Sequence, residues 1–243
     1  MKKYFIIVFV NLLLLSCNMQ FSYASDDVLN FIPAILSAQN NNVDIGIGTV
    51  RTATGKIWMD KNLGATRIAI SMLDKESFGD LYQWGRLKDG HEKRYSNTIN
   101  ATSYSDNPGH GYFITPQMYT DWRNPHNKNL WQGVSGINNP CPSGFRLPTA
   151  KEFSDEIKTW RSYNPEGAFA SPLKLVLAGY RLTTGVLNTD YPPTNAVGNR
   201  GCYWTSSTTH NPYSDYLSLS TEHAAIGYIG SRAEGCSVRC IKN

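Results

Sequence analysis

Three apolar residues in the second half of the chain recur at helical spacing. They are Phe153, Ile157 and Trp160. Thr149 precedes them, and Glu152 follows it by three residues, which is the pattern of a capping box at a helix N-terminus. The sequence therefore predicts a helix that starts after Thr149 and packs one face inward. The run Asn-Pro-Glu-Gly at residues 164–167 predicts its end.

Short apolar or alternating runs predict strands elsewhere in the chain. The predicted strands cover residues 56–60, 173–181, 202–205, 216–220 and 236–241. Within 216–220, Leu217 and Leu219 face one way, and the polar or aromatic residues between them face the other. One helix followed by several short antiparallel strands is typical of an α+β domain.

Two stretches before the helix are less regular. Residues 77–84 fit either a short helix or a strand that leads into a loop. Residues 86–131 are long, polar and rich in turns. A loop of that length in a compact domain usually carries function or is heavily braced, so we expect one or the other here.

The N-terminus has the pattern of an export signal. Lys2 and Lys3 precede an apolar run at residues 4–15 that is too short to span a membrane comfortably. The run ends in Leu-Leu-Ser-Cys at 14–17, which resembles the lipobox of bacterial lipoproteins. That resemblance implies that Cys17 is lipidated and anchors the chain in the cell envelope, at the outer membrane or cell surface. The alternative is an ordinary signal peptide cut after Ala24.

Composition divides the rest of the chain and limits its partners. We expect a signal peptide over residues 1–17, a polar tether over 18–42 and one domain over 43–243. The net charge of the 243-residue chain is +4, with no long basic run. Nucleic-acid binding needs clustered Lys and Arg, so we expect no nucleic acid as a partner.

Four further cysteines follow Cys17. They are Cys141, Cys202, Cys236 and Cys240. An even number in an exported chain indicates two disulfides, with three pairings open. Zinc binding is the rival, but the spacing lacks a C-x-x-C pair. In the predicted last strand Cys236, Val238 and Cys240 share an inner face at period two.

Five sequence blocks stand in a recognisable order. They are GKIWMDKNLGA at 55–65, GDLYQWGR at 79–86, NPCPSGFRLPT at 139–149, YWTSS at 203–207 and GCSVRC at 235–240. Together they resemble the Fibrobacter succinogenes major paralogous domain over about residues 43–243. The resemblance implies a C-type-lectin-like fold, which is similar to that of formylglycine-generating enzymes. It also implies disulfides between Cys141 and Cys240 and between Cys202 and Cys236.

The segment 208–232 is similar to the variable region of lectin-fold proteins diversified by retroelements. An ordinary polar surface loop is the alternative, and a binding face fits both. Tyrosines offer rigid contact area there, while Ser, Thr and Asn adapt their hydrogen bonds. The expected ligand-binding residues are Thr208, Thr209, His210, Asn211, Tyr213, Asp215, Tyr216, Ser218, Ser220, Glu222, His223 and Tyr228.

Enzymatic chemistry has less support in the sequence. The four domain cysteines have structural uses, which leaves no thiol for chemistry of the formylglycine-generating type. No nucleophile elbow, phosphate loop or dinucleotide fingerprint occurs. We therefore expect no catalytic residues and no enzyme activity.

No cofactor or metal is expected either. The run Asp89-Gly90-His91-Glu92 contains metal-ligand types, but we expect a braced loop there. Sugar-binding C-type lectins hold calcium with Glu-Pro-Asn or Gln-Pro-Asp and a Trp-Asn-Asp run, which this chain lacks.

The sequence thus predicts an envelope lipoprotein that binds an unidentified protein or glycan. The alternatives are an oxidoreductase of the formylglycine-generating type and a structural envelope protein without a specific ligand.

Overall fold

The computed structural model describes residues 48–117, 120–188 and 198–243 of the chain, and the fold below is that of its second compact unit, Ile47–Asn243. Cys17, the predicted signal peptide, the tether and the predicted start of the domain at residue 43 lie outside the described residues. None of the helices within the described ranges is long and apolar enough to cross a membrane.

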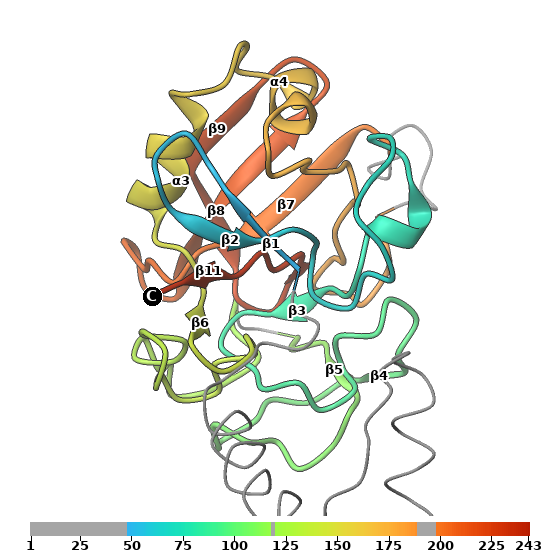
Figure 1. Ribbon diagram of the computed structural model, residues 1–243. Helices are drawn as coiled ribbons and strands as arrows, with labels where there is room; N and C mark the ends of the chain where they lie inside the picture. Colours follow the sequence, from blue (N-terminus) through green and yellow to red (C-terminus); the bar gives the residue numbers. More distant parts are fainter. Residues whose placement is uncertain (1–47, 118–119, 189–197) are drawn as a thin grey trace, which may run out of the picture. The chain divides into compact units, whose positions relative to one another are not determined.

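The described residues form an α+β fold with four small sheets and short helices (Figure 1). One sheet has the order β1 (Thr49–Arg51), β2 (Ile57–Met59), β11 (Ile241–Lys242), β6 (Phe145–Arg146). A second sheet contains β7 (Arg200–Trp204), β8 (Tyr213–Ser220) and β9 (Ala224–Ser231), all antiparallel. The pair β3 (Tyr82–Gln83) and β10 (Gly235–Cys236) is antiparallel, and the pair β4 (Thr98–Ile99) and β5 (Phe113–Ile114) is parallel. The helices are η1 (Lys75–Ser77, a 3-10 turn), α3 (Ala150–Ile157) and α4 (Pro165–Ala170).

The predicted helix is confirmed as α3. The Thr149 hydroxyl accepts from the Glu152 backbone N–H, and the Glu152 carboxylate accepts from the Thr149 N–H, so the capping box is present. Phe153 and Ile157 are buried on its inner face. The predicted end is wrong: α3 ends at Ile157, before Trp160, and the run at 164–167 instead starts a second helix, in which Asn164 is the N-cap and Pro165 the first residue.

Two predicted strands are wrong in extent. Residues 173–181 are mostly buried but form no strand, only isolated bridges at Ala178, Gly179 and Arg181. Distant side chains form hydrogen bonds with the backbone of this segment instead. The Tyr203 hydroxyl accepts from the Val176 N–H and donates to the Val176 carbonyl. A buried backbone needs hydrogen bonds, and here distant side chains supply them in place of a strand ladder.

The predicted last strand, 236–241, is also different. It divides into the end of β10 and the start of β11, which belong to different sheets. Ser237 and Arg239 are as buried as the cysteines, so there is no outer face. The Arg239 guanidinium donates to Asn62 Oδ1 and to the Leu173 carbonyl at 2.6 Å, and these contacts satisfy a buried charge.

The other strand predictions hold. β2 lies within 56–60, β7 covers most of 202–205, and β8 contains 216–220 with Leu217 and Leu219 fully buried. The open choice at 77–84 resolves into the end of η1 and, further along, β3.

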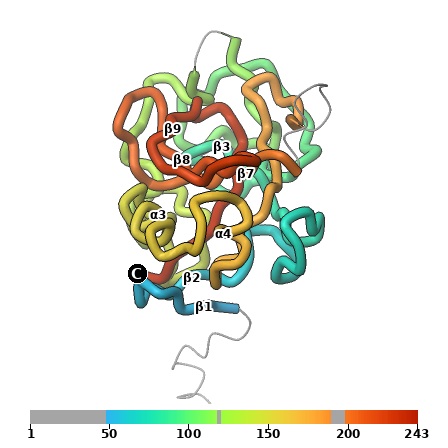
Figure 2. Tube along the Cα trace, turned by 90° about the horizontal axis from the view of Figure 1, so that it is seen from above, coloured from blue at the N-terminus to red at the C-terminus, as the bar shows by residue number. Residues whose placement is uncertain are grey.

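The β7–β8–β9 sheet lies between two cores. In Figure 2 it stands between α3 and α4 on one side and β3 on the other. Tyr203 and Leu217 face the helices and pack in a core with Phe153. Cys202 and Trp204 face the opposite way, into a core rich in tryptophan. Because both faces are partly covered, the position of every residue along β8 is fixed.

Two disulfides connect these parts. Cys141 is bonded to Cys240 with Sγ–Sγ 2.06 Å, and Cys202 is bonded to Cys236 with Sγ–Sγ 2.15 Å. These are the two pairs that the family resemblance implies. The first joins the segment before α3 to the residue before β11, and the second joins β7 to β10.

Candidate ligand-binding face

The predicted binding residues lie on the β8–β9 hairpin and on the loop before β8. The exposed ones are Thr209, His210, Asn211, Glu222, His223 and Tyr228, and the half-buried ones are Thr208, Tyr213, Tyr216, Ser218 and Ser220. They fall into two groups: a loop group before β8, and a group on β8 and β9 that surrounds Tyr216.

Asp215 does not belong to an exposed face, and that prediction is wrong. Its side chain is buried, and its carboxylate accepts a hydrogen bond from the Thr209 hydroxyl. Its backbone carbonyl also accepts from the Thr205 hydroxyl at 2.8 Å. Asp215 lies on the same face of β8 as Leu217, which points into the core, so its carboxylate serves to hold the preceding loop.

Four aromatic side chains form a continuous row across the sheet. Trp204, Tyr216 and Tyr228 are directly opposite one another in the β7–β8 and β8–β9 registers. The ring centroids of Trp204 and Tyr216 are 5.9 Å apart, those of Tyr216 and Tyr228 6.0 Å, and those of Tyr228 and His223 5.8 Å. We call these four residues the aromatic row. It runs from the fully buried Trp204 to the exposed Tyr228 and His223.

Hydrogen bonds fix the exposed end of the row. The Tyr228 hydroxyl lies 2.7 Å from His223 Nε2, and the Ser220 hydroxyl lies 2.9 Å from His223 Nδ1. The ring planes of His223 and Tyr228 are stacked with an angle of 16°. Aromatic side chains held in this way present contact area with little rotamer freedom left to lose on binding.

The local sequence explains why the row forms. Ser220 and His223 exchange backbone hydrogen bonds around a tight two-residue turn, which places β9 directly against β8. A register shift between Tyr216 and Ser218 forms an irregularity opposite Gly227, whose φ is 106°. A Cβ on Gly230 would lie 3.0 Å from Trp204 and 3.2 Å from Tyr216, so this glycine permits the two rings to approach.

A small cleft opens beside the row. It has a volume of about 60 Å³ and is lined by Tyr180, Arg200, Gly201, Cys202, Tyr216, Ser218 and Glu234. Burial raises the pKa of Glu234 to about 7. Burial, together with the nearby Glu234 charge, raises the pKa of Tyr216 to about 12. We call this cleft the Glu234 cleft.

Sequence reasoning missed three residues of the Glu234 cleft: Tyr180, Arg200 and Glu234. Tyr180 lies within the predicted buried strand 173–181, and Arg200 precedes the predicted strand 202–205. Glu234 stands beside the GCSVRC block but belongs to no motif. No linear signal marks these residues, because the cleft is assembled from positions up to 54 residues apart.

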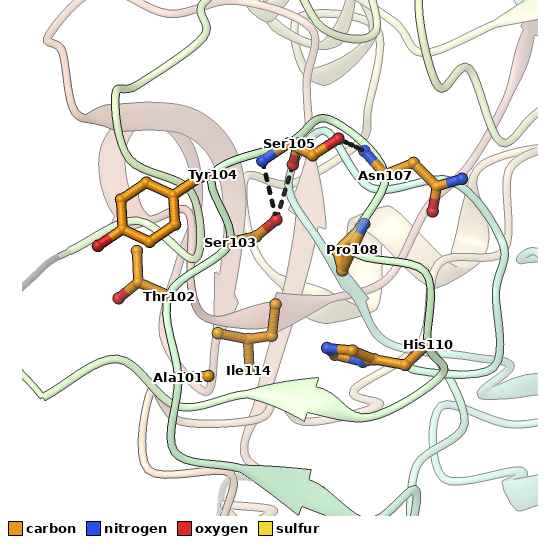
Figure 3. Close-up of a pocket in the computed structure, with 9 residues that line it drawn as sticks. All are labelled: Ala101, Thr102, Ser103, Tyr104, Ser105, Asn107, Pro108, His110 and Ile114. Carbon is orange, nitrogen blue, oxygen red and sulfur yellow. Dashed lines mark hydrogen bonds between the residues drawn. The ribbon is translucent and has the colours of Figure 1, made fainter.

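A larger hollow lies in the loop region around β4 and β5 (Figure 3). Its volume is about 360 Å³, and its walls include Tyr104, Pro108, His110 and Ile114. The polar groups of its rim are largely used within the loop: the Ser103 hydroxyl donates to the Ser105 carbonyl and accepts from the Ser105 N–H. The hollow is a rival binding place, with Tyr104 as its exposed aromatic residue.

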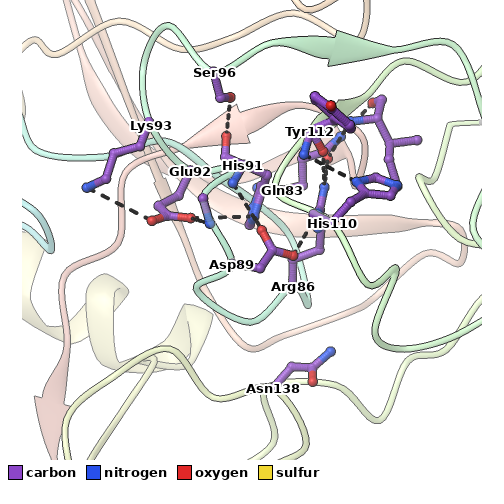
Figure 4. A network of polar contacts seen from close by, with 12 residues as sticks. Gln83, Arg86, Asp89, His91, Glu92, Lys93, Ser96, His110, Tyr112 and Asn138 are labelled. Atoms are coloured by element: carbon purple, nitrogen blue, oxygen red, sulfur yellow. Dashed lines mark hydrogen bonds and ion pairs between the residues drawn. The ribbon is translucent and has the colours of Figure 1, made fainter.

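The run at 89–92 forms a buried polar network (Figure 4). Ligand atoms of Asp89, His91 and Glu92 lie within 4.8 Å of one another. However, His91 Nε2 accepts from the Gln83 N–H, its Nδ1 contacts Asp89 at 2.6 Å, and Asp89 also accepts from Arg86 at 2.6 Å. Burial lowers the pKa of His91 to about 4, so the ring is neutral near pH 7.

These contacts make the network a brace for the long loop. The atoms that a cation would need already have hydrogen-bond partners, and the Arg86 guanidinium lies directly beside them. Burial raises the pKa of Asp89, but the hydrogen bond from His91 and the charge of Arg86 outweigh it and lower that pKa to about 2. The expectation of a braced loop at 86–131 therefore has a physical basis in the Arg86–Asp89–His91 contacts.

The thiols of the described residues are all in disulfides, since each of the four cysteines there has a partner. In comparisons with protein-family models, curated proteins and solved structures, nothing matches this chain.

Proposed function

We propose that this chain is an envelope lipoprotein whose C-type-lectin-like domain binds a protein or glycan ligand on the β8–β9 face. The aromatic row is the observation that carries the proposal. It joins a tryptophan fixed in the core to a tyrosine at the surface through the strand register, and His223 stacks on that tyrosine. A surface built this way is preorganised for contact.

The framework supports the same interpretation. Cys202, on the same strand as Trp204 of the row, is bonded to Cys236, and the sheet is packed on both faces. The C-type-lectin-like fold is favoured by the five blocks in order, the α+β architecture and the two cysteine pairs. The lipid anchor at Cys17 is proposed from the lipobox-like run.

The two rival functions make different demands on the molecule. An oxidoreductase of the formylglycine-generating type needs a reactive thiol, and the described cysteines are used in disulfides. A structural envelope protein needs no fixed exposed aromatic residues, whereas here Tyr228 is 41% exposed and yet held by His223. Fixing an exposed ring costs side-chain entropy. In a binding protein that entropy is lost before the ligand arrives, so binding itself costs less.

A ligand screen tests this function. The purified full chain is applied to arrays of glycans and of envelope proteins, beside the variants Tyr228→Ser and Tyr104→Ser. Tyr228→Ser is expected to weaken binding to any ligand found by about tenfold or more, because it removes the exposed aromatic anchor.

Tyr104→Ser is the matched control, since Tyr104 is 77% exposed and lines the hollow of Figure 3. It is expected to bind as the wild type does. If Tyr228→Ser binds as tightly as the wild type and Tyr104→Ser loses binding, the ligand binds in that hollow and not on the β8–β9 face. No ligand on any array would favour the structural role.

A further inference from the structure

The Glu234 cleft is a polar depression in an otherwise covered part of the sheet. Ser218 and Tyr216 of β8 form one wall, Arg200 and Cys202 of β7 the next, and Tyr180 and Glu234 come from flanking segments. It adjoins the aromatic row, since Tyr216 belongs to both. A ligand on the row therefore lies next to the cleft.

Glu234 is the unusual member of this cleft. Its backbone N–H donates to the Ser231 carbonyl, which fixes the turn between β9 and β10. Its carboxylate has no hydrogen-bond or ion-pair partner within the described ranges, and Arg200 is not within ion-pair distance of it. Glu234 is half-buried, and even partial burial of a carboxylate without a partner is unfavourable, so a ligand that brings a positive charge reduces that penalty.

The surroundings of Glu234 select among ligand groups. A Cβ on Gly230 would lie 3.0 Å from both Glu234 Oε2 and Trp204, so the carboxylate is held against the aromatic row. Aromatic faces attract cations, and serine and tyrosine hydroxyls accept hydrogen bonds from an ammonium group. At about 60 Å³ the cleft admits a chain end such as –CH₂–NH₃⁺ but not a whole sugar ring.

We propose that the Glu234 cleft receives the ε-ammonium group of a lysine side chain from a protein ligand that lies on the aromatic row. This inference rests on the proposed binding function and names the class of its ligand. The ammonium group donates to the Glu234 carboxylate, and the aliphatic stem of the lysine passes over Tyr216. No bond is made or broken, so the interaction is reversible binding alone.

Titration of the isotope-labelled full chain with small probes tests the cleft by itself. The probe is Nα-acetyl-lysine N-methylamide, and its uncharged partner carries an additional acetyl group on Nε. We expect saturating NMR shifts at Tyr180, Tyr216, Ser218 and Glu234 with the charged probe. The acetylated probe is expected to bind about 10- to 100-fold more weakly, because it lacks the charge-assisted hydrogen bond.

Glu234→Gln keeps the shape of the side chain and removes its charge, and it is expected to weaken the charged probe by the same factor. Glu166→Gln is the control: Glu166 is exposed on α4, away from the β8–β9 face, and does not line the cleft. It is expected to leave both the shifts and the affinity unchanged.

The pH dependence gives a second measurement. Burial raises the pKa of Glu234 to about 7, so affinity for the charged probe is expected to rise between pH 5.5 and pH 8.5. Lysine stays protonated over that range. The other titratable or charged groups facing Glu234 are Arg200 of β7, Tyr216 of β8 and Tyr180 before β7. In Glu234→Gln the rise is expected to disappear.

Two results would overturn this inference. One is an equal response to the charged and acetylated probes, or an affinity that Glu234→Gln leaves intact. The other is a methyl glycoside that shifts the cleft residues while the lysine probe does not, which would make the cleft a saccharide subsite. Neither result affects the array screen with Tyr228→Ser, so the binding function of the β8–β9 face and the role of the Glu234 cleft are tested independently.

Discussion

Replacing both Cys141 and Cys240 by alanine is expected to lower the free energy of unfolding by about 4–5 kcal/mol. The bond spans 99 residues of sequence, and closing a loop of that length removes a large conformational entropy from the unfolded chain. It also holds the segment before α3 against the fully buried Cys240, which directly precedes β11. Urea unfolding of the oxidised proteins, followed by tryptophan fluorescence, measures the difference.

The second disulfide is the matched control for that prediction. Cys202 and Cys236 are separated by 34 residues, so the same loop-entropy argument gives an effect about 1 kcal/mol smaller for their double alanine variant. The β8–β9 face depends on this second bond, which joins the strand of Trp204 to β10. A Cys141→Ala/Cys240→Ala variant within about 1 kcal/mol of the wild type would contradict the proposed role of the long bridge.

Arg86→Met is expected to lower the free energy of unfolding by about 3–5 kcal/mol. The Arg86 side chain is fully buried and donates to Gln83 Oε1, to Asp89 Oδ2, and to the carbonyls of His110 and Tyr112 (Figure 4). Methionine fills a similar volume but leaves these acceptors, one of them an ionised carboxylate, without donors. Urea unfolding monitored by far-UV circular dichroism measures the change.

Arg67→Met is the control for Arg86→Met. Arg67 also makes a two-point contact with a carboxylate, that of Asp74, but its side chain is 50% exposed. Asp74 is buried but also accepts from the backbone N–H groups of Ile70 and Glu76, so the loss of the half-exposed guanidinium is expected to cost about 1 kcal/mol or less. Similar losses of unfolding free energy in the two variants would show that the Arg86–Asp89–His91 contacts stabilise the protein no more than the Arg67–Asp74 pair does.

Local patterns predicted the parts of the fold that local contacts build. The α3 capping box needs only Thr149 and Glu152, and the alternation in β8 needs only a sheet with one face more deeply buried than the other. Both features can be read from neighbouring residues, because their hydrogen bonds and burial repeat at the helix or strand period.

Contacts between distant residues decided the parts that were not predicted. Residues 173–181 look like a strand, but their backbone is held by Tyr203, Arg239 and Arg94. Asp215 looks like an exposed polar residue, but Thr209 holds it inside. A side chain that replaces a strand partner leaves no periodic trace in the sequence, so such segments are misread.

The candidate site shows the same division. Tyr216, Tyr228 and His223 were expected on a binding face; the strand register pairs Tyr216 with Tyr228, and His223 stacks on Tyr228. Glu234 was not expected, because its role depends on a turn that places it against Gly230 and Trp204. Composition indicates where aromatic and polar residues gather, but only the three-dimensional arrangement shows that the Glu234 carboxylate is half-buried and has no hydrogen-bond partner among the described residues.

The central claim is that ligand binds on the β8–β9 face, and hydrogen–deuterium exchange with the ligand found by array screening tests it most directly. Bound and free protein are compared peptide by peptide, with Tyr228→Ser treated identically. We expect slower exchange in peptides covering residues 213–231 and no change in those covering 101–114. Protection at 101–114, with residues 213–231 unaltered, would contradict the account.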